Sequence, residues 1–86
     1  MNFKVKSNTN VRQLATSISL CITEENKDVT LRAIGAGAVN QMYKALAVAR
    51  GLVASKGIDL LIKPGFDTIT ENDETKTVMV AFLVKK

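Results

Sequence analysis

The sequence predicts an α+β domain in which two helices cover one face of a four-stranded mixed sheet. Alternating apolar residues mark the strands, helical apolar spacing marks the two helices between them, and 86 residues fit one domain over residues 1–86. The predicted order is β-α-β-α-β-β. Because strand-helix-strand connections are right-handed, both helices fall on the same face, which predicts a two-layer sandwich with the other face open.

The first half of the chain supplies a strand, a helix and a second strand. Alternation over Phe3–Lys6 is typical of a strand covered on one face. Asn10 and Gln13 resemble a capping box that opens a helix. The helical apolar stripe consists of Val11, Leu14, Ala15, Ile18, Cys21 and Ile22. Alternation from Val29 to Ala33 predicts the second strand.

The second half supplies a longer helix and two strands. A helical apolar stripe follows Gly35-Ala36-Gly37 and reaches Leu52 or Val53, and Gly57 is well placed to end this helix. Alternation over residues 58–63 predicts a third strand, ended by Pro64-Gly65. We expect residues 66–76 to form a long polar hairpin connection. The almost wholly apolar segment over residues 77–84 then predicts a strand buried on both sides.

The open face of the sheet is expected to mix cations with apolar side chains. The residues expected there are Lys4, Lys6, Arg32, Lys63, Leu61, Met79 and Leu83. Soluble monomers rarely leave a large apolar patch in water, and a domain this small gains stability from self-association. We therefore expect a homodimer or homotetramer. The predicted interface residues are Tyr43, Leu61, Met79 and Leu83.

The composition argues against catalysis. The chain has no His and one Cys, which removes the commonest general base and any Cys/His zinc site. The acidic residues of the polar connection fit a solvated turn. We therefore predict that the protein is not an enzyme and uses no cofactor and no metal.

A cytoplasmic location is expected. Cys21 has no partner for an internal disulfide and lies among apolar residues, as a buried thiol does. The N-terminus alternates charged and apolar residues, unlike a signal peptide. No stretch approaches the roughly 20 apolar residues that cross a bilayer, so no membrane partner is expected.

The charge distribution favours a polyanionic partner. Residues 1–66 carry nine basic and four acidic side chains, whereas residues 67–86 carry three and four. Gly35 and Gly37 would let phosphate approach the N–H groups that open the second helix, although a tight structural turn explains the same glycines. Basic residues on the helices fit either phosphate contacts or ordinary solvated charge. The candidate nucleic-acid-binding residues are Lys6, Arg12, Arg32, Gly35, Gly37, Asn40, Lys44 and Arg50.

Stacking on bases is not expected from the sequence. Tyr43 is the only aromatic residue expected to be exposed, and it also fits a packed or interface position. With only this one candidate ring, a single-strand stacking platform is not expected. The sequence therefore predicts contacts to phosphate rather than to bases.

The segment Ala33–Gln41, together with Lys44–Gly51, resembles the stage V sporulation protein S family. The similarity extends to Lys6-Ser7 with Asn10 and to Gly57–Leu60, and spans nearly the whole chain. The resemblance implies an Alba-like fold, a dimer or higher oligomer, and a role in bacterial sporulation or developmental regulation. Nucleic-acid binding is implied through the fold alone.

Alba-type chromatin proteins are similar in having a basic loop before the first helix, a basic strand-to-helix turn and an arginine-bearing hairpin. This sequence departs at each place: Lys6 stands without a second lysine, the Gly35–Gly37 turn has no basic residue, and the hairpin is acidic. We therefore expect weak, salt-sensitive binding to DNA or RNA. Two alternatives stay open, namely an assembly module that binds protein or a small ligand, and an enzyme acting on a phosphorylated metabolite at the glycine turn.

Overall fold

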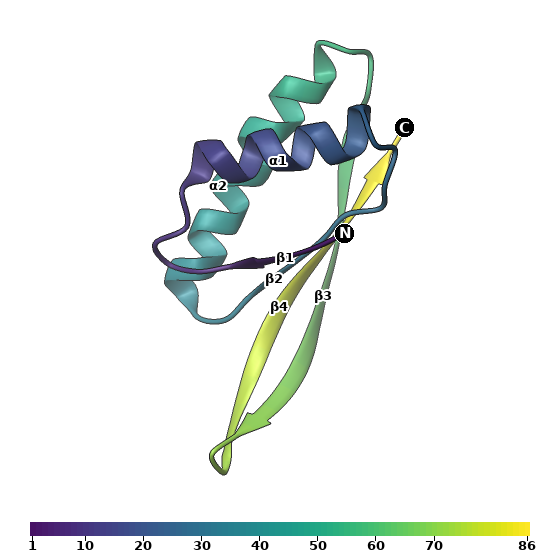
Figure 1. Cartoon of the computed structure of the whole chain (residues 1–86). Helices are drawn as coiled ribbons and strands as arrows, with labels where there is room; N and C mark the ends of the chain where they lie inside the picture. The colour runs from purple at the N-terminus through teal and green to yellow at the C-terminus, as the bar shows by residue number, and fades with distance from the viewer.

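The computed structural model describes residues 1–86 and has two layers, with both helices on the same side of one sheet (Figure 1). The elements are β1 (Asn2–Val5), α1 (Val11–Thr23), β2 (Thr30–Ala33), α2 (Ala36–Ala54), β3 (Leu60–Glu71) and β4 (Glu74–Lys85). The strand order is β1-β2-β4-β3, in which β1 and β2 are parallel and β4 is antiparallel to both neighbours. The predicted α+β architecture and element order are confirmed.

Both helices begin and end where the sequence indicates. The Asn10 side chain accepts a hydrogen bond from the Gln13 backbone N–H at 3.0 Å, which caps α1. α2 continues through Gly51 to Ala54. Gly57 then adopts a φ of +79°, and the Ile58 N–H donates back to the Val53 carbonyl, as in a glycine-terminated helix.

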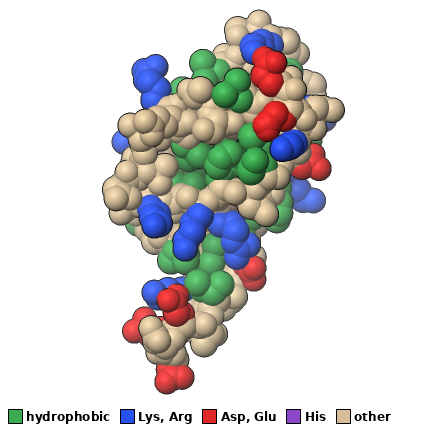
Figure 2. Space-filling model, in the orientation of Figure 1, with side chains coloured by type: hydrophobic (Ala, Val, Ile, Leu, Met, Phe, Trp, Pro, Cys, Tyr) green, Lys and Arg blue, Asp and Glu red, His purple; other side chains and the backbone are tan.

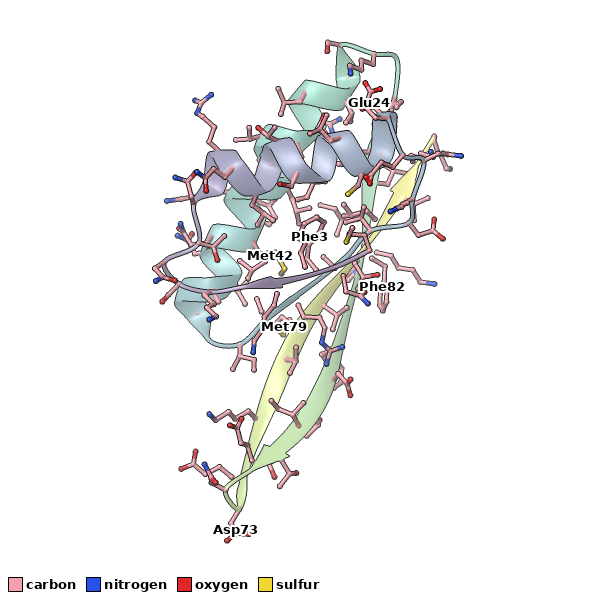
Figure 3. All side chains as sticks on the ribbon, viewed as in Figure 1. Phe3, Glu24, Met42, Asp73, Met79 and Phe82 are labelled. Atoms are coloured by element: carbon pink, nitrogen blue, oxygen red, sulfur yellow. The ribbon has the colours of Figure 1, made fainter.

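The core lies between the helices and the sheet. Fully buried alanines on both helices, Ala15, Ala45 and Ala49, leave room for close packing. Phe3 of β1 and Met42 of α2 extend into this space (Figure 3). The sheet contributes buried side chains from its central strands to the same cluster, including Leu31, Ala33 and Ala81.

The region beyond Lys63 differs from the prediction. β3 continues through Pro64 and Gly65, and the ladder with β4 pairs every residue as far as Glu71 and Glu74. Asn72 and Asp73 alone form the turn, with φ of 51° and 62°. Positive φ at both positions is the type I′ geometry that suits two-residue hairpins. The strand end at Pro64-Gly65 and the long loop over residues 66–76 were therefore wrong predictions, because an edge strand tolerates proline.

The hairpin extends well past the rest of the sheet (Figure 1). β2 pairs with β4 only from Thr30↔Phe82 to Ala33↔Met79, so the outer part of the hairpin has no third strand. The molecule is accordingly elongated, with extents of 45 × 21 × 17 Å. The tip is acidic, with Glu71, Asp73 and Glu74.

The pairing register assigns each β4 side chain to a face. Leu31 and Ala33 lie in the core and pair with Ala81 and Met79, which places those β4 residues on the helix side. Leu83 also packs against the core. The expectation that Met79 and Leu83 lie on the open face is therefore wrong. The open face instead carries Lys4, Arg32, Leu61, Lys63, Val80, Phe82 and Val84.

The prediction that β4 is buried on both sides holds only for part of the strand. Val78, Val80 and Ala81 are buried, but Met79 and Phe82 are 40% and 44% exposed. Met79 lies on the helix side at the point where the hairpin leaves the sheet, and Phe82 lies on the open face, away from both helices, although Val78 and Val80 on that face are buried. The prediction for Lys4, Arg32, Lys63 and Leu61 on the open face is confirmed by the register.

Candidate nucleic-acid interface

A cleft of about 700 Å³ lies where β1, the loop after β1, the turn between β2 and α2, and the base of the hairpin meet. Lys4, Lys6 and Arg32 bring positive charge to its lining. Ile34, Ile69 and Val78 provide an apolar wall. Figure 2 shows Lys and Arg side chains gathered in a band at the level of β1. The volume lies in the range of ligand-binding sites.

The parallel pairing of β1 and β2 explains why the cleft is basic. The carboxyl ends of both strands lie at the same edge of the sheet, so the loop after β1 lies beside the turn after β2. Lys6 follows the end of β1 and Arg32 lies one residue before the end of β2. Lys4 pairs directly with Arg32 across the ladder. Residues that are 28 positions apart in sequence are thereby neighbours.

The two glycines of the turn have separate structural roles. Gly35 adopts a backbone φ of +89°, a conformation that residues with a Cβ rarely adopt. At Gly37, an added Cβ would lie 3.0 Å from the Ser7 Cβ, so any other residue would force Ser7 to shift. The structural-turn alternative therefore accounts for both residues. The same contact brings the loop that carries Lys6 against the first turn of α2.

The loop after β1 is held to α2 by hydrogen bonds. The Lys6 backbone N–H donates to the Thr9 Oγ1 at 2.7 Å, which closes a tight turn. Gln41 Nε2 of α2 donates to the Thr9 carbonyl at 2.9 Å. Sequence reasoning missed Ser7, Thr9 and Gln41 as positioning residues, because only the tertiary contact gives them a role.

The start of α2 offers backbone donors to the cleft. Gly35 is the N-cap residue and has no side chain to satisfy the first N–H groups of the helix. Gly35, Gly37 and Ala38 all line the cleft. A helix N-terminus carries partial positive charge, which adds to that of the three cations.

Arg32 already has one anionic partner. Its Nη2 lies 3.2 Å from Asp67 Oδ2, and both side chains are solvent-exposed. The backbone N–H of Thr68, and then the hydrogen bond from Arg32, hold the pKa of Asp67 below its ordinary value of 3.8. Asp67 is therefore a carboxylate at neutral pH, and it competes with any other anion for Arg32.

Four of the sequence-predicted residues do not line the cleft: Arg12, Asn40, Lys44 and Arg50. Arg12 borders a shallow, wholly polar hollow on α1. Arg50 lies 3.8 Å from Asp59, near the other end of α2. Asn40 and Lys44 are exposed on α2. The structure brings together Lys6, Arg32, Gly35 and Gly37, and it adds Lys4, which was not among the candidate residues.

The family model of stage V sporulation protein S matches residues 1–86, which is the whole chain. The chain belongs to the stage V sporulation protein S family. The resemblance inferred from the Ala33–Gln41 segment is thereby confirmed. Membership of the stage V sporulation protein S family identifies the chain as a sporulation-stage protein.

This stage V sporulation protein S family member exposes more aromatic surface than its sequence predicts. Tyr43 is 71% exposed, as expected, but Phe66 and Phe82 are 76% and 44% exposed. The sequence places Phe66 in a polar loop and Phe82 in a strand buried on both sides. The premise that Tyr43 is the sole exposed aromatic residue was therefore wrong.

The residues predicted to form a subunit interface do not share one surface in this family member. Leu61 lies on the open face, whereas Met79 and Leu83 lie on the helix side of the sheet. Tyr43 lies on α2.

No helix is both long and apolar enough to span a membrane. No group of three or more His, Cys, Asp or Glu residues is placed to hold a metal ion.

Proposed function

We propose that this sporulation-stage protein is a cytoplasmic, non-enzymatic regulator that binds DNA or RNA through phosphate contacts at the basic cleft. The observation that carries the proposal is the convergence of Lys4 and Lys6, from the end of β1, with Arg32 of β2 on one cleft beside the start of α2. Lys and Arg side chains and helix N-termini are the groups that proteins use to contact nucleic-acid phosphates.

The charge arrangement supports moderate rather than tight binding. Three cations line the cleft, and Asp67 partly neutralises one of them. The acidic hairpin tip repels phosphates that approach it (Figure 2). Each phosphate contact releases condensed counterions, so three contacts give a slope of about −2 to −3 in log affinity against log salt.

A titration with labelled oligonucleotides tests the proposal. Fluorescence anisotropy at low salt compares the wild type with Lys6→Glu and Arg32→Glu, each against DNA and RNA of the same sequence. We expect each variant to weaken binding by about tenfold, because a phosphate contact becomes a repulsion. The salt slope should become shallower in both.

Lys86→Glu is the matched control for these two variants. Lys86 follows β4 and lies at the opposite end of the sheet from the cleft, where its backbone pairs with Asp59. It makes the same change in net charge, so a general charge effect would appear equally in all three variants. Absence of binding at low salt, or an equal loss in Lys86→Glu, would contradict the proposal.

A second candidate function is an assembly module that binds protein through the open face. It is favoured by Leu61, Phe82 and Val84, which are 38%, 44% and 41% exposed on that face. Under this alternative, a homodimer or homotetramer covers these side chains. Val84→Asp should then lower the mass measured by light scattering. A mass that does not change in the variant would count against the assembly module.

A further inference from the structure

The open face of the sheet carries an aromatic ring between cations. Phe82 of β4 pairs with Lys63 of β3 on one side and with Thr30 of β2 on the other. The next row of the ladder on this face consists of Lys4, Arg32, Val80 and Gly65. With strands about 4.8 Å apart, Lys4 and Lys63 are separated by three strand spacings, about 14 Å, across the sheet, and they lie in neighbouring rows along it. Phe82 therefore has a cation on each side of it.

Gly65 leaves room for the Phe82 side chain. A Cβ at Gly65 would lie 3.0 Å from Phe82 Cε2, so the edge of the ring occupies the space that a side chain would fill. The ring extends away from the helices (Figure 3) and is 44% exposed. Both helices lie on the other side of the sheet from it (Figure 1). An aromatic ring held in this way offers surface to a planar group from outside.

We propose that this face binds single-stranded nucleic acid in preference to duplex, with one base stacked on Phe82 and the flanking phosphates held by Lys63 and Arg32. The inference rests on the proposed function, since Arg32 and Lys4 also line the phosphate-binding cleft. Stacking on aromatic rings beside a cationic groove is the general means of binding single strands without sequence preference.

The choice of single strands follows from geometry and charge. Bases in a duplex are already stacked and paired, so they cannot lie against a ring at the surface of a sheet without being extruded. The acidic hairpin tip also disfavours the second, closely spaced row of phosphates that a duplex presents. A single strand avoids both costs.

The first test compares Phe82→Leu with Phe66→Leu. Leucine keeps an apolar side chain but removes the ring, and Phe66 supplies an exposed ring on the helix side, where it pairs with Met79. We expect Phe82→Leu to weaken binding of single-stranded DNA or RNA by about tenfold and to leave duplex affinity within about twofold. Phe66→Leu should leave both unchanged, and Phe82→Tyr should bind as the wild type does.

A tryptophan reporter provides a direct readout of stacking. The chain contains no Trp, so Phe82→Trp introduces a single fluorophore at the proposed contact. We expect single-stranded oligonucleotides to quench its fluorescence and matched duplexes to quench it much less. Phe66→Trp is the control, and its fluorescence should not respond. Phe82→Trp keeps an aromatic ring, so the fluorescence is read from a variant that still binds and does not depend on a variant that has lost binding.

The outcomes separate the two proposals. If the wild type binds no nucleic acid, the proposed function fails, and this inference fails with it. If the wild type binds and Arg32→Glu weakens binding, but Phe82→Leu has no effect and Phe82→Trp is not quenched, the inference is overturned while the proposed function stands. If Phe82→Leu instead lowers the mass in light scattering without changing single-strand affinity, the face is a subunit interface and the inference is likewise overturned.

Discussion

Because Gly37 has no side chain, the first turn of α2 can pack against the loop after β1, and both segments belong to the candidate site. The Cα of Gly37 can approach Ser7 because no Cβ intervenes, and this contact holds Lys6 beside the start of α2. The glycine is thus needed for packing, and the basic cleft depends on that packing. The sequence indicated the glycines but gave no means of choosing between a structural turn and a phosphate contact.

Gly37→Val should damage both the fold and the cleft. Its branched side chain would meet Ser7, where even a Cβ lies at 3.0 Å, and we expect a stability loss of about 1–3 kcal/mol. Nucleic-acid affinity should fall as the loop moves. Thermal unfolding and anisotropy measure the two effects. Gly51→Ala is the control, because nothing lies within 4 Å of a Cβ added there. Alanine in a helix is about 0.5–1 kcal/mol more stable than glycine, so this variant should not lose stability.

Asp67 should limit the affinity of the cleft. It lies 3.2 Å from Arg32, and Asp67→Asn removes this competing charge. We expect affinity for nucleic acid to rise by up to about fivefold, the range of an exposed ion pair. Asp59→Asn removes the same charge beside Arg50, outside the cleft, and should change affinity little. Equal effects of the two variants would show that Asp67 has no specific role.

The acid dependence of Asp67 has a definite sign. Because its pKa is lowered in the folded state, its contribution to stability is present above pH 3.8 and is lost as pH falls through the lowered value. Arg32→Gln should raise the pKa of Asp67 without restoring the ordinary value, since the Thr68 N–H still donates to the carboxylate. Side-chain NMR titration measures the pKa of Asp67 in the wild type and in Arg32→Gln. A pKa unchanged by Arg32→Gln would contradict the pairing.

The hairpin shows where sequence patterns fail. Helices α1 and α2 were predictable because one face of each is buried and the apolar residues recur at helical spacing. The outer hairpin is solvated on both sides, so residues 66–76 are polar without alternation, a pattern that predicts a loop. The faces of β4 were also ambiguous, because both carry apolar residues and only the pairing of Leu31 with Ala81 decides between them.

The candidate site was predictable in part for a related reason. Lys6 and Arg32 lie near the ends of parallel strands, so topology alone brings them to one edge. Arg12, Lys44 and Arg50 lie on exposed helix surfaces, where sequence does not distinguish a binding residue from a solvated charge. Phe82 was missed because its exposure depends on the absence of any covering element.

The two-residue turn should be improved by glycine. Asp73 has a φ of 62°, which costs an ordinary residue about 1 kcal/mol and costs glycine little. Asp73→Gly creates the Asn-Gly pair that type I′ turns prefer, and we expect a gain of about 0.5–1 kcal/mol in the free energy of unfolding. Asp73→Asn separates the removal of charge from the backbone effect. An equal stability gain in Asp73→Asn and Asp73→Gly would mean that charge repulsion, not backbone strain, limits the turn.

The whole molecule is electrically divided along its length. Its net charge is +4, and the cations of the cleft and the open face lie near the body, whereas the hairpin tip is acidic (Figure 2). A polyanion is therefore attracted to the end of the sheet where β1 and β2 finish and is repelled from the tip of the hairpin. Under the proposals above, this polarity restricts a bound single strand to a path across the cleft and the open face.

Mapping amide chemical shifts of the labelled protein during titration with a single-stranded oligonucleotide tests this account most directly. We expect salt-sensitive changes confined to residues 4–7, 32–38, 63–65 and 80–82, which form the cleft and the adjoining open face. Changes centred on the exposed surface of α2, or none at low salt, would contradict it.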